Sequence, residues 1–373
     1  MDTADYMPHH IRREWCGFVM NEYDIGVSLL GRLERERTLT TDEYLWLIDH
    51  RSDALAACAA ERAVAVRKAV YDTDVYIRGL IEIGNICKNN CLYCGIRAGN
   101  QTCDRYRLTK EQILDACAEG YAIGFRTFVL QGGEDPHFTE AWVCDVVRAV
   151  KAAYPDCAVT LSLGEYPRET YAAFREAGAD RYLLRHETAD AAHYEKLHTP
   201  HQRFEERMRC LRDLKELGFQ VGCGFMVGSP YQTSAMLAKD LKFIEEFKPD
   251  MCGIGPFIPH HATPFADFKA GTLEQTTYLL SLIRLIHPSV LLPATTALGT
   301  IHPQGREKGI LAGANVIMPN LSPRDHRTKY ELYDNKLHTD AEAAENRRLL
   351  EEQITAIGYK VVTARGDVKN GLQ

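Results

Sequence analysis

The sequence predicts a single (β/α)8 barrel of the TIM type, and two observations favour that fold class. From residue 75 onward, short β-branched or aliphatic runs alternate with helical stretches, and this alternation is typical of a parallel sheet covered by helices. Eight such runs fit within roughly 245 residues, the usual size of such a barrel. An open, doubly wound sheet is the alternative, but it requires a glycine-rich phosphate turn after the first strand. A cysteine-rich loop occupies that position here.

The predicted strands and helices follow one another in regular order. The eight strands are expected at residues 75–83, 127–131, 158–163, 181–186, 220–227, 251–258, 290–296 and 314–318. The helices between them are expected at residues 109–123, 139–153, 168–177, 204–217, 233–247 and 273–286. Thr109 and Gln112 have the spacing of a capping box, which predicts the start of the first of these helices.

Residues 1–72 precede the first strand and are predicted to form an N-terminal helical extension. Thr40 and Glu43 again have the spacing of a capping box, which predicts the start of a helix. An alanine-rich stretch at 54–69 predicts another helix, because alanine has the highest helix propensity. We therefore expect at least two helices before the barrel begins.

The barrel is expected to span residues 73–322, and residues 323–373 are expected to pack on it as a short C-terminal segment. The chain becomes more polar after residue 320. A helical stretch at about 340–357 is followed by a strand-like tail at 359–363. The sequence therefore predicts one barrel with a helical addition at each end.

Composition places the chain among ordinary globular proteins and argues against two kinds of partner. Hydrophobic residues make up 45% and charged residues 25% of the chain, and its formal net charge is −7. No cluster of Lys and Arg is dense enough to bind phosphate groups, so we expect no nucleic-acid partner. The N-terminus lacks the apolar core of a signal peptide. The apolar stretch 279–292 is interrupted by Arg284, His287 and Pro288, so we expect a cytoplasmic protein without a membrane span.

The chain contains twelve cysteines, and without an export signal we expect their thiols to be reduced in the cytosol. Eight of them lie in mainly apolar surroundings and are expected to pack as small hydrophobic side chains. These eight are Cys16, Cys58, Cys117, Cys144, Cys157, Cys210, Cys223 and Cys252. The other four lie close together between residues 87 and 103.

Cys87, Cys91 and Cys94 form a Cys-x3-Cys-x2-Cys motif directly after the first predicted strand. This spacing lets one loop wrap a compact metal centre. A [4Fe–4S] cluster has four irons and normally binds four thiolates, so three thiolates leave one iron open to a ligand that is not protein. An open iron indicates a site for chemistry, whereas a fully ligated cluster indicates electron transfer.

A structural zinc site is the alternative interpretation of this loop. Zinc takes four tetrahedral ligands, usually from two Cys-x2–4-Cys knuckles or from Cys pairs with His pairs. The sequence has no second knuckle, and His186 and His198 are not spaced as a zinc-finger pair. Cys103 offers a fourth thiolate but lies nine residues beyond Cys94. We therefore favour the iron–sulfur interpretation.

The cysteine motif, with the aromatic Tyr93 before its last cysteine, resembles the signature of the radical S-adenosylmethionine (SAM) superfamily. In that superfamily the open iron is chelated by the amino and carboxylate groups of SAM. One electron from the cluster then cleaves SAM to methionine and a 5′-deoxyadenosyl radical, which attacks the substrate. The resemblance implies that Cys87, Cys91 and Cys94 are catalytic and bind the cluster metal.

Charged residues follow the fourth predicted strand toward its carboxyl end, where barrel enzymes place their active sites. Arg181, Arg185 and Glu187 alternate in sequence, so their side chains are expected on one face. They could form an internal salt-bridge network that fixes the barrel. Alternatively, the arginines could bind the carboxylates of SAM and of an anionic substrate.

Small and hydroxylated residues lie at two other strand ends. Gly132 and Gly133 follow the second strand, where the missing side chains would let a ligand approach the backbone. Thr295 and Thr296 end the seventh strand and offer hydroxyl and N–H groups to a carboxylate. Ordinary β-branched strand packing explains this threonine pair equally well.

Several strand-end strings are together similar to one family of this superfamily, the HydE family of [FeFe]-hydrogenase maturases. The similarity extends from about residue 75 to residue 333 and separates the chain from biotin synthase and methylornithine synthase. The strings include Tyr-Ile-Arg78-Gly-Leu-Ile-Glu, Leu-Gln131-Gly-Gly-Glu-Asp-Pro, Thr-Leu-Ser162-Leu-Gly-Glu, Asp-Arg181-Tyr-Leu-Leu-Arg185-His-Glu187-Thr, Gly-Ile-Gly-Pro-Phe-Ile-Pro-His and Pro-Ala-Thr295-Thr296-Ala.

This resemblance implies a role for each matching residue. The residues implied to bind the cofactor SAM are Tyr93, Gln131, Gly132, Gly133, Ser162, Glu187, Arg207 and Met251. The residues implied to line the substrate cavity and its anion sites are Arg78, Arg181, Thr295, Thr296, Met318 and Tyr333.

The resemblance also implies a reaction, in which SAM cleavage supports assembly of the diiron subcluster of the hydrogenase H-cluster. The implied substrate is a small iron–cysteine complex carrying CO and cyanide, attacked at sulfur. Implied partners are other hydrogenase maturation proteins and a cytosolic electron donor. Two alternatives stay open: a radical SAM enzyme of the biotin synthase or methylornithine synthase type with an organic substrate, and a non-enzymatic iron–sulfur scaffold.

One difference from the family concerns a second metal site. Some HydE proteins have a second, peripheral iron–sulfur site formed by cysteines after the last strand. In this chain the corresponding region, residues 333–342, contains no cysteine. We therefore expect one [4Fe–4S] cluster and no second one.

Overall fold

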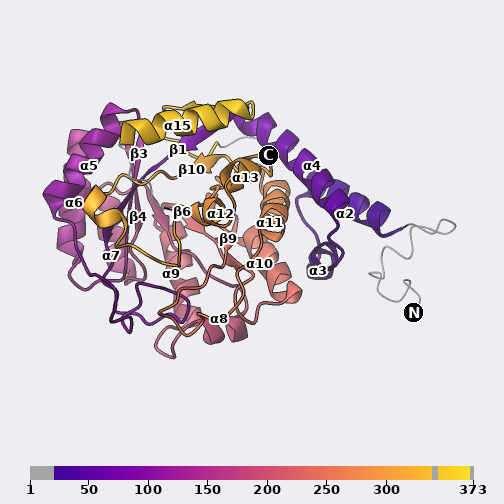
Figure 1. Ribbon diagram of the computed structural model, residues 1–373, viewed down its shortest axis with the longest axis horizontal. Helices are drawn as coiled ribbons and strands as arrows, with labels where there is room; N and C mark the ends of the chain where they lie inside the picture. The colour runs from indigo at the N-terminus through magenta and orange to yellow at the C-terminus, as the bar shows by residue number, and fades with distance from the viewer. Residues whose placement is uncertain (1–20, 338–342, 370–373) are drawn as a thin grey trace.

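Parallel strands form the centre of the fold, seen in a computed structural model that describes residues 21–337 and 343–369. Six strands pair in the order β2-β3-β4-β5-β6-β8, and helices surround them (Figure 1). The strands of the barrel are β1 (Asp74–Ile77), β2 (Gly79–Gly84), β3 (Thr127–Gly132), β4 (Ala158–Ser162), β5 (Arg181–Leu183), β6 (Gln220–Cys223), β7 (Met226–Val227), β8 (Met251–Cys252), β9 (Gly255–Pro256) and β10 (Val316–Ile317). Of these, β1, β7, β9 and β10 pair in two smaller sheets.

Single parallel bridges close these strands into a ring. Met251 in β8 pairs with Leu291, and Pro293 pairs with Val316 in β10. β10 then pairs in parallel with β1, which continues into β2. The predicted (β/α)8 barrel is therefore confirmed, with all of its neighbouring strands parallel.

Two predicted strands are interrupted where their backbones approach closely. The expected strand at 220–227 divides into β6 and β7, and the one at 251–258 divides into β8 and β9. Between them, Gly224 has a φ of +149° and lies so close to Gly253 that a Cβ on it would be 2.0 Å from the Gly253 carbonyl oxygen. Only glycine fits this approach, and the ladder is lost there.

Two other predicted strands differ for local reasons. The strand expected at 75–83 divides at Arg78 into β1 and β2. The strand expected at 290–296 makes only isolated bridges, because Pro293 has no N–H to donate to a ladder. Thr296 already begins a helix, so the assignment of the threonine pair to strand packing is wrong.

The helices that cover the barrel differ from the predicted bounds by at most one residue. Thr109 and Gln112 form the expected capping box, and a threonine N-cap also precedes α6, α10 and α11. These helices are α5 (Lys110–Ala122), α6 (Glu140–Ala153), α7 (Arg168–Glu176), α9 (Phe204–Glu216), α10 (Ser234–Phe247) and α11 (Leu273–Ile286). Short helices not predicted are α8 (Ala191–Leu197), α12 (Thr296–Ile301), α13 (Gly305–Ile310) and α14 (Arg324–Arg327).

The N-terminal helices lie against the flank of the barrel, at the right of Figure 1. They are α2 (Glu22–Glu36), α3 (Thr41–Asp49) and α4 (Asp53–Tyr71). α3 begins with the expected capping box of Thr40 and Glu43 and packs on α10, while α4 packs on α11. The Tyr44 hydroxyl donates to Glu245 at 2.7 Å and fixes α3 to α10. Residues 1–20, including Cys16, lie outside the described residues.

The C-terminal segment returns to the beginning of the barrel. α15 (Ala343–Ala356) leads to β11 (Lys360–Val362), which pairs in parallel with β1. Residues 363–369, called here the C-terminal strap, then cross the amino ends of several strands. Of the predicted helix at 340–357, residues 340–342 lie outside the described residues. The division of the chain at residues 72 and 322 stays a prediction.

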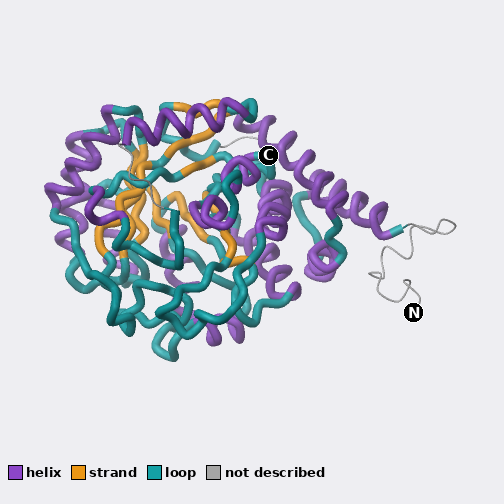
Figure 2. The backbone as a smooth tube through the Cα atoms, in the orientation of Figure 1, coloured by secondary structure: helices purple, strands orange, loops and turns teal. Residues whose placement is uncertain are grey.

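The core lies inside the ring and between the ring and its helices, with the strands in the interior of Figure 2. Six of the cysteines expected to pack as hydrophobic residues are buried, and Cys58 is half-buried. No helix within residues 21–337 or 343–369 has both the length and the apolar character needed to cross a bilayer.

Candidate functional site

The three cysteines lie in the loop that joins β2 to α5, at the carboxyl end of the barrel. Cys87, Cys91 and Cys94 all line a cavity of about 340 Å³, within the size range of ligand sites. Backbone bonds fix the loop at both ends: Lys88 N–H donates to the Glu134 carbonyl at 2.9 Å, and Gly95 N–H donates to the Leu332 carbonyl at 2.9 Å. The loop is therefore held in place by neighbouring segments.

The environment of the three thiols favours their neutral form. Burial raises the pKa of Cys91 to about 11, and the nearby Cys87 adds to this effect. Burial and the charges of Cys91 and Cys87 likewise raise the pKa of Cys94. Metal ligands must be thiolates, so these three sulfurs require a positively charged centre among them. Three converging thiols in one loop fit such a centre.

Gly133 makes room for the cysteine loop. A Cβ on Gly133 would lie 2.3 Å from the Ile86 carbonyl oxygen and 2.8 Å from Cys87 Cβ. The space beside this residue is thus filled by the cysteine loop itself, which approaches the end of β3 because no side chain stands between them. At Gly133 the missing side chain therefore makes room for Cys87, and the expectation that it also lets a ligand approach stays a prediction.

Cys103 does not join the other three cysteines. It is absent from the cavity lining, and its Sγ accepts a hydrogen bond from Asn85 Nδ2 at 3.4 Å. Within the described part of the chain, the cavity is therefore lined by three thiols rather than four. A four-thiolate zinc site is not formed in this arrangement.

The wall opposite the cysteines is built by β4, β5 and α9. Arg207, from α9, donates from Nε to Glu165 Oε1 and from Nη1 to the Arg185 carbonyl, each at 2.5 Å. Glu187 has a left-handed backbone with φ +66°, a strained conformation for a residue other than glycine that is common at functional sites. Arg185, Glu187 and Arg207 thus line the cavity together, and Glu165 supports Arg207 from behind.

Several polar atoms around this cavity have no hydrogen-bond partner within the described residues. Arg185 Nη2 lies 2.9 Å from Glu187 Oε2, so the two groups form an ion pair, but neither of these buried atoms makes a hydrogen bond. Arg185 Nε and Thr295 Oγ1 are unsatisfied too. Such groups are costly unless a ligand pairs with them. They are able to bind amino, carboxylate or hydroxyl groups of a ligand.

The cavity brings together most of the residues that the sequence predicted for it. Gln131 donates from Nε2 to the Tyr330 hydroxyl at 3.4 Å across the cavity. Predicted residues that line the cavity are Cys87, Cys91, Tyr93, Cys94, Gln131, Gly132, Gly133, Ser162, Glu187, Arg207, Thr295, Thr296, Met318 and Tyr333. Their individual roles stay predictions.

Arg78, Arg181 and Met251 are not among the residues that line this cavity. Arg181 is the first residue of β5 and Met251 the first of β8, so both lie at the amino end of the barrel. Arg181 bonds Asp367 of the C-terminal strap at 2.5 Å, and Arg78 donates to Met251 Sδ at 2.6 Å. The predicted network around strand four is therefore divided, with Arg181 at the base and Arg185 at the cavity.

Some cavity residues were missed by sequence reasoning. Glu82 and Lys336 form an ion pair in the wall, and Asn320 Nδ2 donates to Glu82 Oε2 at 2.8 Å. A carboxylate near the end of the apolar run 75–83 was a usable signal. Gln202, which contacts Cys91, gave none, because a glutamine in a polar loop has no distinguishing pattern.

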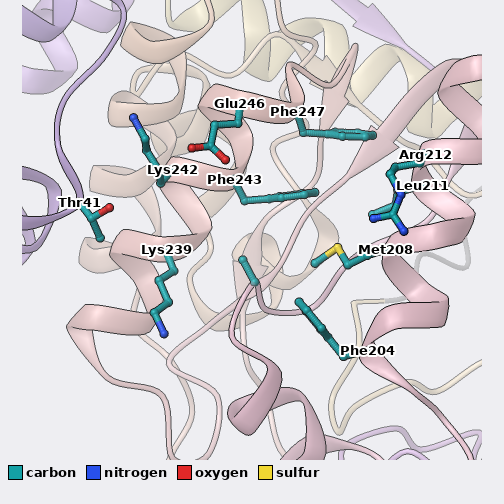
Figure 3. A pocket seen from close by; sticks show the side chains of 11 residues that line it. Thr41, Phe204, Met208, Leu211, Arg212, Lys239, Lys242, Phe243, Glu246 and Phe247 are labelled. Atoms are coloured by element: carbon teal, nitrogen blue, oxygen red, sulfur yellow. The ribbon is translucent and has the colours of Figure 1, made fainter.

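A second hollow lies outside the barrel, between α9 and α10, and has a volume of about 490 Å³ (Figure 3). Figure 3 shows aromatic and aliphatic side chains facing each other across it, with charged side chains at its rim. Its apolar lining includes Phe204, Met208, Leu211, Phe243 and Phe247. It contains no cysteine and is separate from the cavity described above.

Comparison with known proteins agrees with this site. Residues 81–244 match the Radical SAM superfamily. The chain is 45% identical over 312 residues to the [FeFe] hydrogenase maturase subunit HydE of Thermotoga maritima, covering 84% of this chain and 88% of that protein. It is 30% identical over 264 residues to 3-methylornithine synthase of Methanosarcina acetivorans, covering 70% and 73% of the two chains.

Solved structures agree on the fold. The crystal structure of methylornithine synthase has a TM-score of 0.79 at 26% identity, covering 90% of this chain and 97% of that one. The crystal structure of HydG, a maturase of the [FeFe]-hydrogenase, has a TM-score of 0.76 at 20% identity, covering 92% and 77%.

Proposed function

Because the chain belongs to the HydE family of [FeFe]-hydrogenase maturases, radical SAM enzymes, we propose that it modifies a small iron–cysteine complex during assembly of the diiron subcluster. The observation that carries the proposal is the single cavity where three converging thiols face unsatisfied polar groups of Arg185, Glu187 and Thr295. The family implies a [4Fe–4S] cluster and SAM, and we propose that the chain binds one cluster only. We also propose that it acts in the reducing cytoplasm, with an electron donor and other maturation proteins as partners.

Cys87, Cys91 and Cys94 would hold the cluster. When bound and reduced, that cluster supplies the electron that cleaves SAM. The chain's own residues bind and orient the ligands. Gly133 lets the loop carrying Cys87 seat against β3, and Arg207 holds Glu165 and the Arg185 carbonyl in fixed positions. Arg185 and Glu187 present a positive and a negative group side by side, which suits the carboxylate and ammonium of an amino acid.

The substrate end of the cavity would be formed by Thr295, Thr296, Met318 and Tyr333. Thr295 caps the amino end of α12 without a side-chain bond to it, so its hydroxyl is free to bind a ligand. Burial raises the pKa of Tyr333 to about 12, so it stays neutral and able to donate. These groups suit the carboxylate or cyanide of an iron–cysteine complex. Arg78 and Arg181 do not line the cavity, so their predicted role in substrate binding has no such support.

The test is made on anaerobically reconstituted, reduced protein supplied with SAM. Adenosyl products are quantified with and without a synthetic iron–cysteine carbonyl/cyanide complex. We expect product formation to depend on the complex, to disappear in Cys91→Ala, and to persist in Cys103→Ala, the matched control from the same loop. Equal SAM cleavage with and without the complex would refute the substrate. A cluster without any SAM cleavage would indicate a scaffold instead.

A second candidate is a radical SAM enzyme with an organic substrate. The 30% identity to 3-methylornithine synthase over 73% of that protein favours it. Hydrogen abstraction from an organic substrate into 5′-deoxyadenosine, detected by deuterium transfer, would support this candidate over the first.

A further inference from the structure

A single side chain outside the cysteine loop reaches a cluster-binding sulfur among the contacts of the described residues. Gln202, in the loop between α8 and α9, donates from Nε2 to Cys91 Sγ at 3.0 Å. The same loop region supports its neighbours: Leu92 N–H donates to the Leu197 carbonyl at 3.0 Å, and the Tyr93 hydroxyl lies 3.3 Å from His198 Nε2. The segment 197–202 thus packs along the cysteine loop.

The orientation of the Gln202 amide is fixed by its surroundings. Its Oε1 accepts from the Thr199 hydroxyl at 3.3 Å, and its backbone N–H donates to the Thr199 carbonyl at 2.9 Å. Because the carbonyl oxygen of the amide is engaged by a donor, the NH2 group is the one that faces sulfur. Only 8% of Gln202 is exposed, so water does not compete well for this donor.

We propose that Gln202 is a positioning residue that sets the reduction potential of the cluster through the Cys91 thiolate. The proposal rests on the proposed function, because it requires Cys91 to be a cluster ligand. Hydrogen bonds to the sulfurs are among the properties that determine cluster potentials. An N–H donor stabilises the state with more negative charge on sulfur, which is the reduced cluster. Gln202 therefore makes the cluster easier to reduce, which is the step that any SAM cleavage requires.

The test is a redox titration followed by electron paramagnetic resonance, on full-length reconstituted protein without SAM or substrate. Gln202→Leu keeps a similar volume and removes the donor. We expect its cluster to be reduced at a potential up to about 59 mV more negative. For one electron, that shift is about a tenfold change in the reduction equilibrium. Thr199→Val removes only the hydroxyl that orients the amide, and we expect a smaller shift in the same direction. Gln202→Asn, which keeps an amide, should restore part of the loss.

Iron and sulfide content identify the cause of each result. Variants with unchanged content and a lowered potential would support the proposal. A wild-type potential in Gln202→Leu with a full cluster would overturn it, and would leave the proposed function intact. If Gln202→Leu loses its cluster, the test relies on Thr199→Val instead. An unchanged reduction potential in Thr199→Val would then overturn the proposal as well. Wild-type protein that forms no cluster would overturn the proposed function and this inference together.

Discussion

Two arginines at opposite ends of the barrel, Arg181 and Arg185, differ in how far the chain satisfies them. At the base, Arg181 is 1% exposed and fully bonded, to Thr127, Gln220, Asp367 and the Arg365 carbonyl. At the mouth, only four residues later in the chain, the Arg185 side chain has unsatisfied nitrogen atoms beside Glu187. The bonding of Arg181 is completed within the chain, whereas that of Arg185 is left incomplete.

This difference indicates where binding energy is available. Donors that already bond to protein gain little from a ligand, because folding has satisfied them. Donors held rigidly without partners gain a full hydrogen bond when a ligand arrives, so the cost of leaving them unsatisfied is repaid on binding. The same residue type is therefore structural at one end and available for recognition at the other.

The largest expected effect is at the mouth. Cys94→Ser should lower cluster content and SAM cleavage by more than about 100-fold, because changing even the outer partners of metal ligands costs up to that amount. Iron content and adenosyl products measure it. Cys103→Ser is the matched control and should keep both. Equal losses in the two variants would mean that Cys103 is a ligand and that the three-thiol site is wrong.

The second-largest effect is expected for an ion pair that also lies at the mouth but is already satisfied within the chain. Glu82 is fully buried and pairs with Lys336. Glu82→Gln should lower the free energy of unfolding by about 3–5 kcal/mol, because the Lys336 ammonium is left buried without its charge partner. Urea denaturation measures this. Glu82→Leu combined with Lys336→Met removes both charges and should recover much of the loss; a double variant no more stable than the single one would contradict the argument.

A smaller effect is expected at the base. Burial opposes ionisation of Asp367, but the hydrogen bond from Arg365 and the charge of Arg181 outweigh it and lower the Asp367 pKa to about 2. An unfolded aspartate titrates near ~3.9. This contribution to stability is therefore present above about pH 4 and is lost as the pH falls toward 2. Asp367→Asn should cost about 1–3 kcal/mol at pH 7.

The pH dependence supplies the control for this prediction. The stability difference between wild type and Asp367→Asn should narrow between pH 4 and pH 2, as thermal unfolding over that range would record. A difference that stays constant with pH would show that the Asp367 charge is not what holds the C-terminal strap.

The smallest effect is expected for Arg78. It is fully buried, its Nε is unsatisfied, and burial lowers its pKa. Replacing a buried, poorly paired charge with an apolar side chain is often neutral or stabilising, so Arg78→Met should change the free energy of unfolding by about 1 kcal/mol or less. A large loss of activity without a loss of stability would return Arg78 to a role in substrate binding, and would weaken the contrast between the two ends.

The sequence predicted well what local chemistry determines. Helix starts were found because Thr40 and Thr109 cap their helices through residues three positions away. The cysteine loop was found because its spacing is short and its place after a strand is fixed. Interruptions at Gly224 and Pro293 were missed, although both residue types are known to break strands.

Contacts between distant parts of the chain could not be predicted in this way. Arg181 and Asp367 are separated by 186 positions, and Gln202 and Cys91 by 111. No local pattern marks either pair, because each depends on how the ring closes and where its connections cross. For that reason Arg181 was predicted at the cavity, whereas its side chain bonds the C-terminal strap.

The strap at the base has a consequence for the order of turnover. With Arg78, Thr127 and Arg181 buried beneath it, the described residues close the base of the barrel. Ligands are therefore expected to enter the cavity from the carboxyl end of the barrel, where the cysteines lie. We expect two molecules that share this entrance to bind in a fixed order, which steady-state kinetics would record as an ordered sequential pattern.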